Sequence, residues 1–257
     1  MISTVDPQAR HGHKTASRGF DGYKGHIAID PDSKIITATE VTAGNVGDAS
    51  AAEALLKDVL PPDAADAPCP APARAEVFGD ASYGTAELVE KVEAADVEAN
   101  MKVQSPSPPR VGMFSQHDFA VDTQAGTVTC PRGLRVVLRT SRDGSKVAEF
   151  GPHCDDCPMR PKCTASKEGR SVRLHPKHAV LDRARTRQRD PAWRARYRAT
   201  RPKVERKIAH LMRRKHGGRR ARMRGRLRVG YDFALLAAAV NIARLAVLGV
   251  RVERANP

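Results

Sequence analysis

The stretch GHIAIDPDSKIITATEVTAG, residues 25–44, decides how the first part of this chain folds. Two runs rich in β-branched and apolar residues, 26–29 and 35–41, flank the sequence Asp30-Pro-Asp-Ser33. Proline at the second position of such a tetrapeptide is typical of a type I turn. The stretch therefore predicts a β-hairpin.

Outward from the hairpin, segments of helix and strand alternate. The expected elements are a short helix over Asp48–Leu60, a proline-rich linker over 61–72, a buried strand over Ala75–Gly79, a helix from the cap Thr85 to about Ala95, and a strand over Val97–Val103. Capping by threonine and the spacing of apolar residues support the helices. This order predicts a mixed α/β layer, a sheet flanked by helices.

Three prolines in 105–109 interrupt this pattern. The section up to about His178 is rich in turns and short strands (127–130, 134–139 and 147–150), and holds four of the five cysteines. We therefore expect three parts: residues 1–104 and 179–257, which form one α/β domain, and residues 105–178, a small β-rich insertion.

The part after Ala179 reads as helical. We expect one helix through Tyr197, a second from Pro202 to Lys215, a break at the Gly217-Gly218 pair and an apolar terminal helix over 231–250. Because the terminal segment contains Asp232, Asn241 and Arg244, its uninterrupted apolar runs are too short for a membrane span. It predicts a core helix and no membrane partner.

The composition narrows the class of protein. The chain has 257 residues, a net charge of +15, 40% hydrophobic residues and only 4% aromatic ones. Residues 1–25 are polar and basic, without the apolar core of a secretory signal, so we expect a cytoplasmic, nucleoid-associated protein. Five cysteines in such a chain favour free thiols or metal ligands over disulfides.

Positive charge is concentrated in one stretch. Residues 170–230 contain 23 Lys and Arg against three acids, which gives this stretch a charge of +20. Such density is typical of a surface that binds nucleic-acid phosphates and releases counterions, so DNA is the expected partner. The alternative is a merely solvated basic face.

Glu205 is one of those three acids. Helical spacing aligns it with Ile208 and Met212, which predicts a carboxylate on the inward, apolar face of its helix. Asp80 ends a buried strand, where open α/β sheets place catalytic groups. Together the two carboxylates could chelate hard cations such as Mg²⁺ or Mn²⁺ for phosphoryl transfer. The alternative is an ion pair of Glu205 with Arg201 or Arg206.

The cysteines form a second candidate site. Cys154-x2-Cys157-x5-Cys163 is a tight cluster, and Cys130 lies in a knuckle-like Thr-Cys-Pro-Arg-Gly. Four thiolates suit a tetrahedral structural Zn²⁺ site, which would stabilise a section with few apolar residues. Reduced cysteines in a loop are the alternative, and Cys69 in the linker is expected to be a bystander.

Several motifs together resemble a known family. They are His11-Gly-His-Lys14, Phe20-Asp-Gly-Tyr-Lys-Gly-His26, Val41-Thr-Ala-Gly-Asn45 with Asp48, Gly79-Asp-Ala-Ser-Tyr-Gly84, and the helix Tyr197…Arg201…Glu205 followed by Arg213, Arg214 and Lys215. This set resembles a DDE transposase of bacterial insertion sequences, in the branch with a cysteine-bearing insertion.

The resemblance implies an RNase H-like fold, in which two aspartates and a glutamate hold Mg²⁺ or Mn²⁺ and cut and join DNA. It assigns the second aspartate to Asp80 and the glutamate to Glu205. It also implies that Tyr197 and Arg201 contact transposon-end DNA, that Arg213, Arg214 and Lys215 extend the basic face, and that the protein acts as a homodimer.

The first aspartate of the family pattern has no clear counterpart. Asp6 and Asp30 are the candidates, but the pattern places this aspartate on a strand before the hairpin, and only 22 residues precede Tyr23. The sequence therefore resembles an N-terminally truncated reading frame with impaired catalysis. The competing interpretations are a non-catalytic, zinc-stabilised nucleic-acid-binding protein and an inactive remnant of a mobile element.

Overall fold

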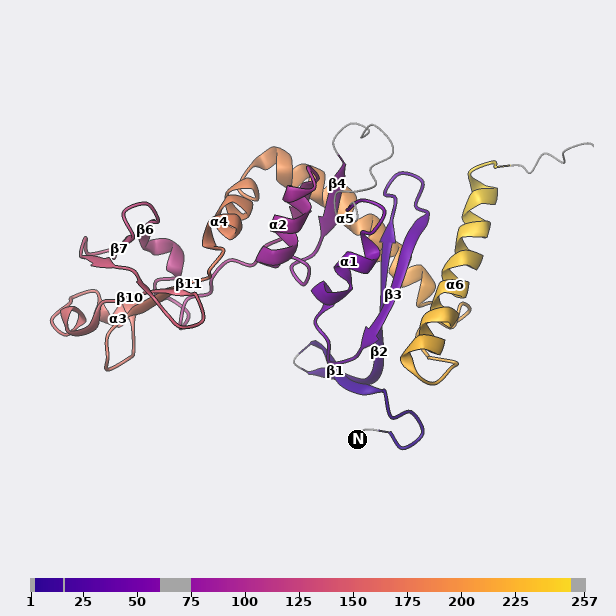
Figure 1. The fold of residues 1–257 in the computed structure, drawn as a ribbon, viewed down its shortest axis with the longest axis horizontal. Coiled ribbons are helices and arrows are strands. Elements are labelled where there is room, and N and C mark those ends of the chain that lie inside the picture. The colour runs from indigo at the N-terminus through magenta and orange to yellow at the C-terminus, as the bar shows by residue number, and fades with distance from the viewer. Residues whose placement is uncertain (1–2, 16, 61–74, 251–257) are drawn as a thin grey trace, which may run out of the picture. The chain divides into compact units, whose positions relative to one another are not determined.

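The computed structural model describes residues 3–15, 17–60 and 75–250, and the predicted linker 61–72 lies outside these ranges. The chain divides into two compact units (Figure 1). The first unit combines Met1–Val103 with Thr186–Pro257, and the second is Gln104–Arg185. The second unit is thus inserted between two parts of the first.

The first sheet contains the predicted hairpin. Strands β1 (Arg10–Thr15), β2 (Arg18–Ile29) and β3 (Ile36–Ala43) are antiparallel in the order β1-β2-β3. The turn between β2 and β3 is closed by Asp30, whose carboxylate accepts hydrogen bonds from the hydroxyl and the N–H of Ser33. The hairpin prediction is confirmed, whereas β1, a polar strand, was not anticipated.

A second, two-stranded sheet carries the turn with Asp80. Strands β4 (Glu76–Gly79) and β5 (Glu98–Met101) are parallel and are connected by helix α2 (Ala86–Ala94). The Thr85 hydroxyl accepts the Leu88 N–H at the start of α2, which confirms the predicted cap. The helix expected over 48–60 is shorter, with a 3-10 turn η1 (Asp48–Ala51) and α1 (Ala52–Leu55).

The helices after residue 177 differ from the prediction. Helix α4 (His178–Arg187) ends before Asp190, which caps α5 (Pro191–Leu211), and α5 continues through Pro202. The predicted break at Pro202 was wrong. Proline at the first turn favours a helix start at Pro191, and α5 packs against both β4 and β2, which offsets the hydrogen bond that Pro202 removes.

Helix α6 (Arg226–Val247) packs on β3 and closes the core of the first unit. Its Asn241 side chain donates to and accepts from the backbone of Ile36. The buried core residues here are Ile27, Ile36, Val41, Leu211, Val229, Phe233, Ala237 and Val240.

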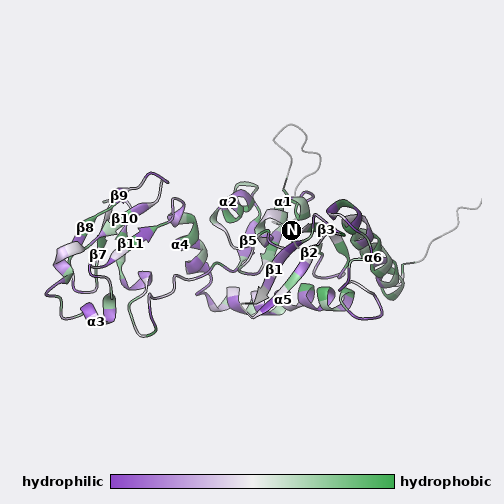
Figure 2. Cartoon of the chain, turned by 90° about the horizontal axis from the view of Figure 1, so that it is seen from below, coloured by the Kyte–Doolittle hydropathy of each residue, from purple (hydrophilic) through white to green (hydrophobic). Residues whose placement is uncertain are grey.

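Only one face of α6 is buried, so the prediction of a core helix holds for that face alone. Apolar side chains remain exposed on the rest of the helix, which Figure 2 colours by hydropathy; they include Leu227, Tyr231, Leu235, Ile242 and Val247. Within the described ranges, α6 is the helix with the length and hydropathy that a membrane crossing would need, and 22% of its apolar 18-residue segment is buried.

The second unit contains two small antiparallel sheets around its own core. One sheet has the order β6-β7-β8 and the other β11-β10-β9. The strands are β6 (Ala120–Asp122), β7 (Thr127–Thr129), β8 (Arg135–Val137), β9 (Arg139–Thr140), β10 (Lys146–Glu149) and β11 (Ser171–Leu174), and the short helices are η2 (Gln116–Asp118), η3 (Gly151–Cys154) and α3 (Arg160–Cys163). Phe119, Val128 and Phe150 lie in its core with Cys154 and Cys163.

Candidate functional site

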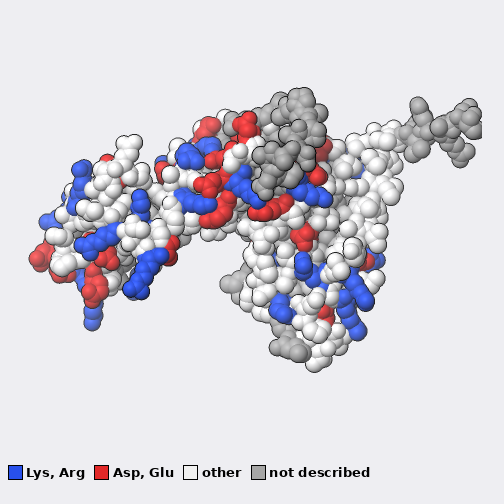
Figure 3. Space-filling model, viewed as in Figure 1, with Lys and Arg blue, Asp and Glu red and all other residues white. Residues whose placement is uncertain are grey.

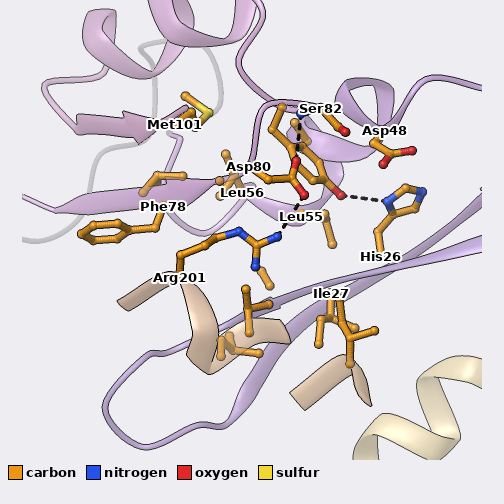
Figure 4. Close-up of a pocket in the computed structure, with 18 of the residues that line it drawn as sticks. His26, Ile27, Asp48, Leu55, Leu56, Phe78, Asp80, Ser82, Met101 and Arg201 are labelled. Carbon is orange, nitrogen blue, oxygen red and sulfur yellow. Dashed lines mark hydrogen bonds and ion pairs between the residues drawn. The ribbon is translucent and has the colours of Figure 1, made fainter. Parts of the chain in front are cut away.

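Asp80 lies in the turn directly after β4. One carboxylate oxygen accepts the Ser82 N–H at 2.9 Å, which closes the turn. The other oxygen accepts a hydrogen bond from Nη2 of Arg201 at 2.9 Å. Figure 4 shows this pair from the cavity side, with Arg201 projecting from α5 toward the end of β4. The strand end thus presents a carboxylate to the helix, as the sequence predicts.

Glu205 contacts the same guanidinium. Nη1 of Arg201 lies 3.4 Å from Oε1 of Glu205, one helical turn along α5. The side chain of Arg201 is only 14% exposed. Because both carboxylates touch one planar group, they lie within roughly 10 Å of each other, close enough to share ions about 4 Å apart. Two acids that are far apart in the sequence therefore converge.

The predicted orientation of Glu205 was wrong. Its side chain is 62% exposed rather than turned toward the sheet. Val204 and Ile208 pack on the core of the first unit. Because consecutive helical residues are about 100° apart, Glu205 is rotated away from that face. The alternative that the sequence left open, an ion pair with Arg201, is what the structure shows.

Tyr197 and Arg201 fasten α5 to the end of β4. The Tyr197 hydroxyl donates to the Gly79 carbonyl at 3.0 Å, and its ring stacks on Trp193 with centroids 4.9 Å apart. Burial raises the pKa of Tyr197, so the phenol stays protonated and remains a donor. Both residues therefore position Asp80 in this structure, and their contact with DNA remains a prediction.

A cavity of about 880 Å³ opens beside Asp80. At this end it is lined by His26, whose Nδ1 lies 2.8 Å from the Tyr83 hydroxyl and whose Nε2 lies 2.9 Å from Oγ1 of Thr42 (Figure 4). Asp48 also lines it and pairs with Lys24 at 2.8 Å. Both ring nitrogens of His26, on β2, therefore have hydrogen-bond partners. No sequence spacing groups it with Asp80, because the two lie on different strands.

Burial lowers the pKa of His26, and burial also raises the pKa of Tyr83. As the pH falls below about 6.5, the unfolded chain binds a proton before the folded chain does, so stability is lost as the pH passes through the folded pKa. We expect the free energy of unfolding to fall between pH 7.5 and pH 5, and to fall less in His26→Gln.

Urea denaturation at both pH values measures this difference. Burial also lowers the pKa of His178 and His210, so a residual dependence is expected in the variant. An equal pH dependence in wild type and His26→Gln would contradict the assignment.

Neither candidate for a third carboxylate belongs to this site. Asp6 accepts hydrogen bonds from the Tyr23 hydroxyl and the Gly225 N–H, and so ties the N-terminal segment to the start of α6. The hydrogen bonds of Asp30 close the hairpin turn. In the ranges that the structure describes, no three or more His, Cys, Asp or Glu side chains are arranged to hold a metal ion.

The four predicted zinc ligands gather in the second unit. Cys130, Cys154, Cys157 and Cys163 all line one cavity of about 440 Å³. Cys154 Sγ accepts the Arg170 N–H at 3.4 Å, and burial, with smaller contributions from the other cysteines, raises the pKa of Cys163. The chain thus brings the thiols together, but their arrangement here is not that of a metal site.

The basic stretch is partly neutralised by acids from elsewhere in the chain. Among the described residues of the first unit, basic side chains of this stretch form ion pairs with acids; these are Arg187 with Glu93, Arg196 with Glu76 and Glu98, Arg201 with Asp80 and Glu205, Lys203 with Asp32, Arg222 with Asp232, and Arg226 with Glu40. Figure 3 shows acidic and basic side chains interleaved on one face.

Arg213, Arg214 and Lys215 follow the end of α5 and are exposed. The ion pairs account for a minority of the 23 basic residues in the stretch, and this exposed trio is a candidate phosphate contact.

The comparisons with known proteins agree with this site in part. Residues 129–246 match the family described as "Transposase DDE domain". The matched segment includes Glu205, Arg201 and the four clustered cysteines, while Asp80 precedes it. No curated protein and no solved structure matches the chain. The match and the mixed α/β fold support a DDE transposase, and a function related to transposition.

Proposed function

We propose that this chain is the catalytic region of a DDE transposase with an RNase H-like fold, acting on the DNA ends of an insertion sequence in the cytoplasm. The observation that carries the proposal is the meeting of Asp80 and Glu205 on Arg201, across 125 positions of sequence. The match of residues 129–246 to the transposase family supports it independently of that geometry. A homodimer, which would bring two ends together, belongs to the same proposal.

Asp80 and Glu205 are the carboxylates proposed to hold Mg²⁺ or Mn²⁺, since carboxylate oxygens suit such hard cations. They do not form a metal site in this structure, because both pair with Arg201 and the described ranges contain no group of three His, Cys, Asp or Glu side chains arranged to hold a metal ion. We therefore expect weak phosphodiester cleavage and strand transfer by this polypeptide alone. Before one cation could bind both carboxylates, Arg201 would have to break its ion pair with at least one of them.

A strand-nicking assay tests this function. With supercoiled DNA and Mn²⁺, we expect slow nicking that falls at least tenfold in Asp80→Asn and in Glu205→Gln. Glu149→Gln, which removes an exposed acid of the second unit, is the matched control and should nick at the wild-type rate. Equal nicking rates in wild type and all three variants would contradict the catalytic assignment of the two carboxylates.

The cysteine cluster is proposed to bind a structural Zn²⁺ ion. We expect about one zinc per chain in protein purified without chelators, as in four-cysteine sites, and loss of that zinc in Cys154→Ser. Cys69→Ser is the matched control, because Cys69 is expected to be a bystander. Metal analysis of the three proteins measures the effect, and a zinc-free wild type that unfolds at an unchanged temperature after EDTA would refute it.

The second candidate function is non-catalytic binding of nucleic acid. It is favoured by the ion pairs of Arg201 with Asp80 and Glu205, in which a guanidinium occupies the place that a metal ion would need between the two carboxylates. Salt-dependent DNA binding without any metal-dependent nicking would select this function over the first.

A further inference from the structure

The cavity beside Asp80 continues between two sheets that are not hydrogen-bonded to each other. Residues 23–29 of β2 line one side of it and residues 76–79 of β4 line another. Leu55 at the end of α1 and the following Leu56 form a third wall, and Val204 and Ile208 from α5 form a fourth. Helix α5 contacts both β2 and β4, so it spans the interval between the two strands. The cavity is therefore a slot with a strand along each side.

The backbone of β2 is open toward this slot. The Gly44 N–H donates to the Gly22 carbonyl, so residue 22 and every second residue after it pair with β3. Tyr23, Gly25 and Ile27 then direct their N–H and C=O groups the other way. Strand β1 covers that edge only as far as Gly22. Within the described ranges, no strand pairs with the edge beyond it.

The backbone of β4 is open on the facing side. The Glu98 N–H donates to the Ala75 carbonyl and the Lys102 N–H to the Gly79 carbonyl. In a parallel ladder this makes residues 75, 77 and 79 the ones that bond to β5. Glu76 and Phe78 then direct their backbone groups away from β5, and both residues line the slot. Two rows of backbone donors and acceptors thus border one cavity.

A single β-strand is the ligand that satisfies both rows at once. Unpaired strand edges are templates for strand addition, and buried backbone groups without partners are costly. We propose that the slot between β2 and β4 accepts one β-strand from a partner polypeptide other than a second copy of this chain, joining the two sheets into one. This binding activity goes beyond the proposed function and requires neither DNA nor a metal.

The walls define the chemistry of the incoming strand. Because Leu55, Leu56 and aliphatic residues of α5 enclose it, the strand is expected to be a continuous apolar run and not an alternating one. The four residues of β4 correspond to about 13 Å at roughly 3.3 Å per residue, so the incoming strand needs at least about four residues. One end of the slot is polar, with Lys24, Asp48 and Asp80, so a polar residue is expected to flank the run there.

A labelled peptide tests the proposal on the whole 257-residue chain. Its core is Val-Ile-Val-Ile-Val, which reads the same in both directions, and lysines on both sides keep it soluble. We expect saturable binding by fluorescence anisotropy, and at least tenfold slower hydrogen exchange at the amides of Gly25, Ile27 and Phe78. The matched control peptide is N-methylated at alternate residues, which keeps the side chains and removes backbone donors, and it should not bind.

A pair of variants separates backbone pairing from side-chain contact. Phe78→Pro removes the open N–H of β4 and leaves its ladder to β5, whereas Phe78→Ala removes the same ring and keeps the N–H. We expect peptide affinity to fall at least tenfold more in Phe78→Pro than in Phe78→Ala.

Three results would overturn the proposal. The first is equal binding of the N-methylated peptide, and the second is peptide-induced protection from hydrogen exchange that is confined to the exposed face of α6. The third is that the amides of Gly25 and Phe78 are already protected from exchange without peptide, in a self-associated form of the protein. None depends on nicking or on DNA binding, so this proposal and the proposed function can fail separately.

Discussion

Replacing Phe233 with alanine is expected to destabilise the first unit by about 3–5 kcal/mol, the usual cost of removing a buried aromatic ring. Phe233 belongs to α6, is only 8% exposed, and packs in the core against the hairpin. Its ring is so close to the backbone of β2 that a Cβ on Gly25 would stand 2.9 Å from it. Since domains of this kind are stable by about 5–15 kcal/mol in total, the variant would lose a large share of its folded population at 37 °C.

Tyr231→Ala is the matched control for this experiment. Tyr231 lies on the same helix but is 63% exposed, so its removal should change stability by no more than about 0.5 kcal/mol. Chemical denaturation of both variants, monitored by circular dichroism, gives the two free energies. If Tyr231→Ala were as destabilising as Phe233→Ala, the face of α6 that packs on the sheet would be wrongly assigned.

The second large effect concerns DNA. Replacing Arg213, Arg214 and Lys215 together by alanine is expected to lower the slope of log K against log salt by about 3, because each lost phosphate contact removes about 0.9 from it. These side chains are exposed just beyond the end of α5. Affinity should fall for any duplex sequence, since contacts to the DNA backbone carry no base information.

A second triple variant controls for net charge. Arg110, Arg135 and Arg139 are exposed in the second unit and lie outside the basic stretch, so their replacement removes the same three charges. We expect its salt slope to stay near the wild-type value. Equal slopes in both triple variants, measured by fluorescence anisotropy from 50 to 300 mM salt, would show that net charge alone governs binding.

The sequence predicts best where contacts are local. The hairpin of β2 and β3 is fixed by Asp30, Pro31 and Ser33 within its own turn, and the start of α2 by Thr85 three residues from its partner. Each of these elements was predicted, because the decisive hydrogen bonds join residues a few positions apart.

Prediction was weaker where distant segments compete. The helix was expected to break at Pro202, but contacts of α5 with β4 on one side and β2 on the other keep it continuous. The inward face assigned to Glu205 failed for a similar reason. The apolar residues on either side of it were compatible with two helix rotations, and packing of Val204 and Ile208 on the core selected one of them.

The sequence by itself determined the hairpin, the strand ending at Asp80, the clustering of four cysteines in one section and the density of basic residues. It also carried the resemblance to DDE transposases. Only the tertiary structure decided that Asp80 and Glu205 share Arg201, that acids from distant segments neutralise part of the basic stretch, and that an open slot lies between β2 and β4. The reason is that local sequence fixes backbone conformation, whereas ion pairing and strand adjacency depend on which distant surfaces are brought together.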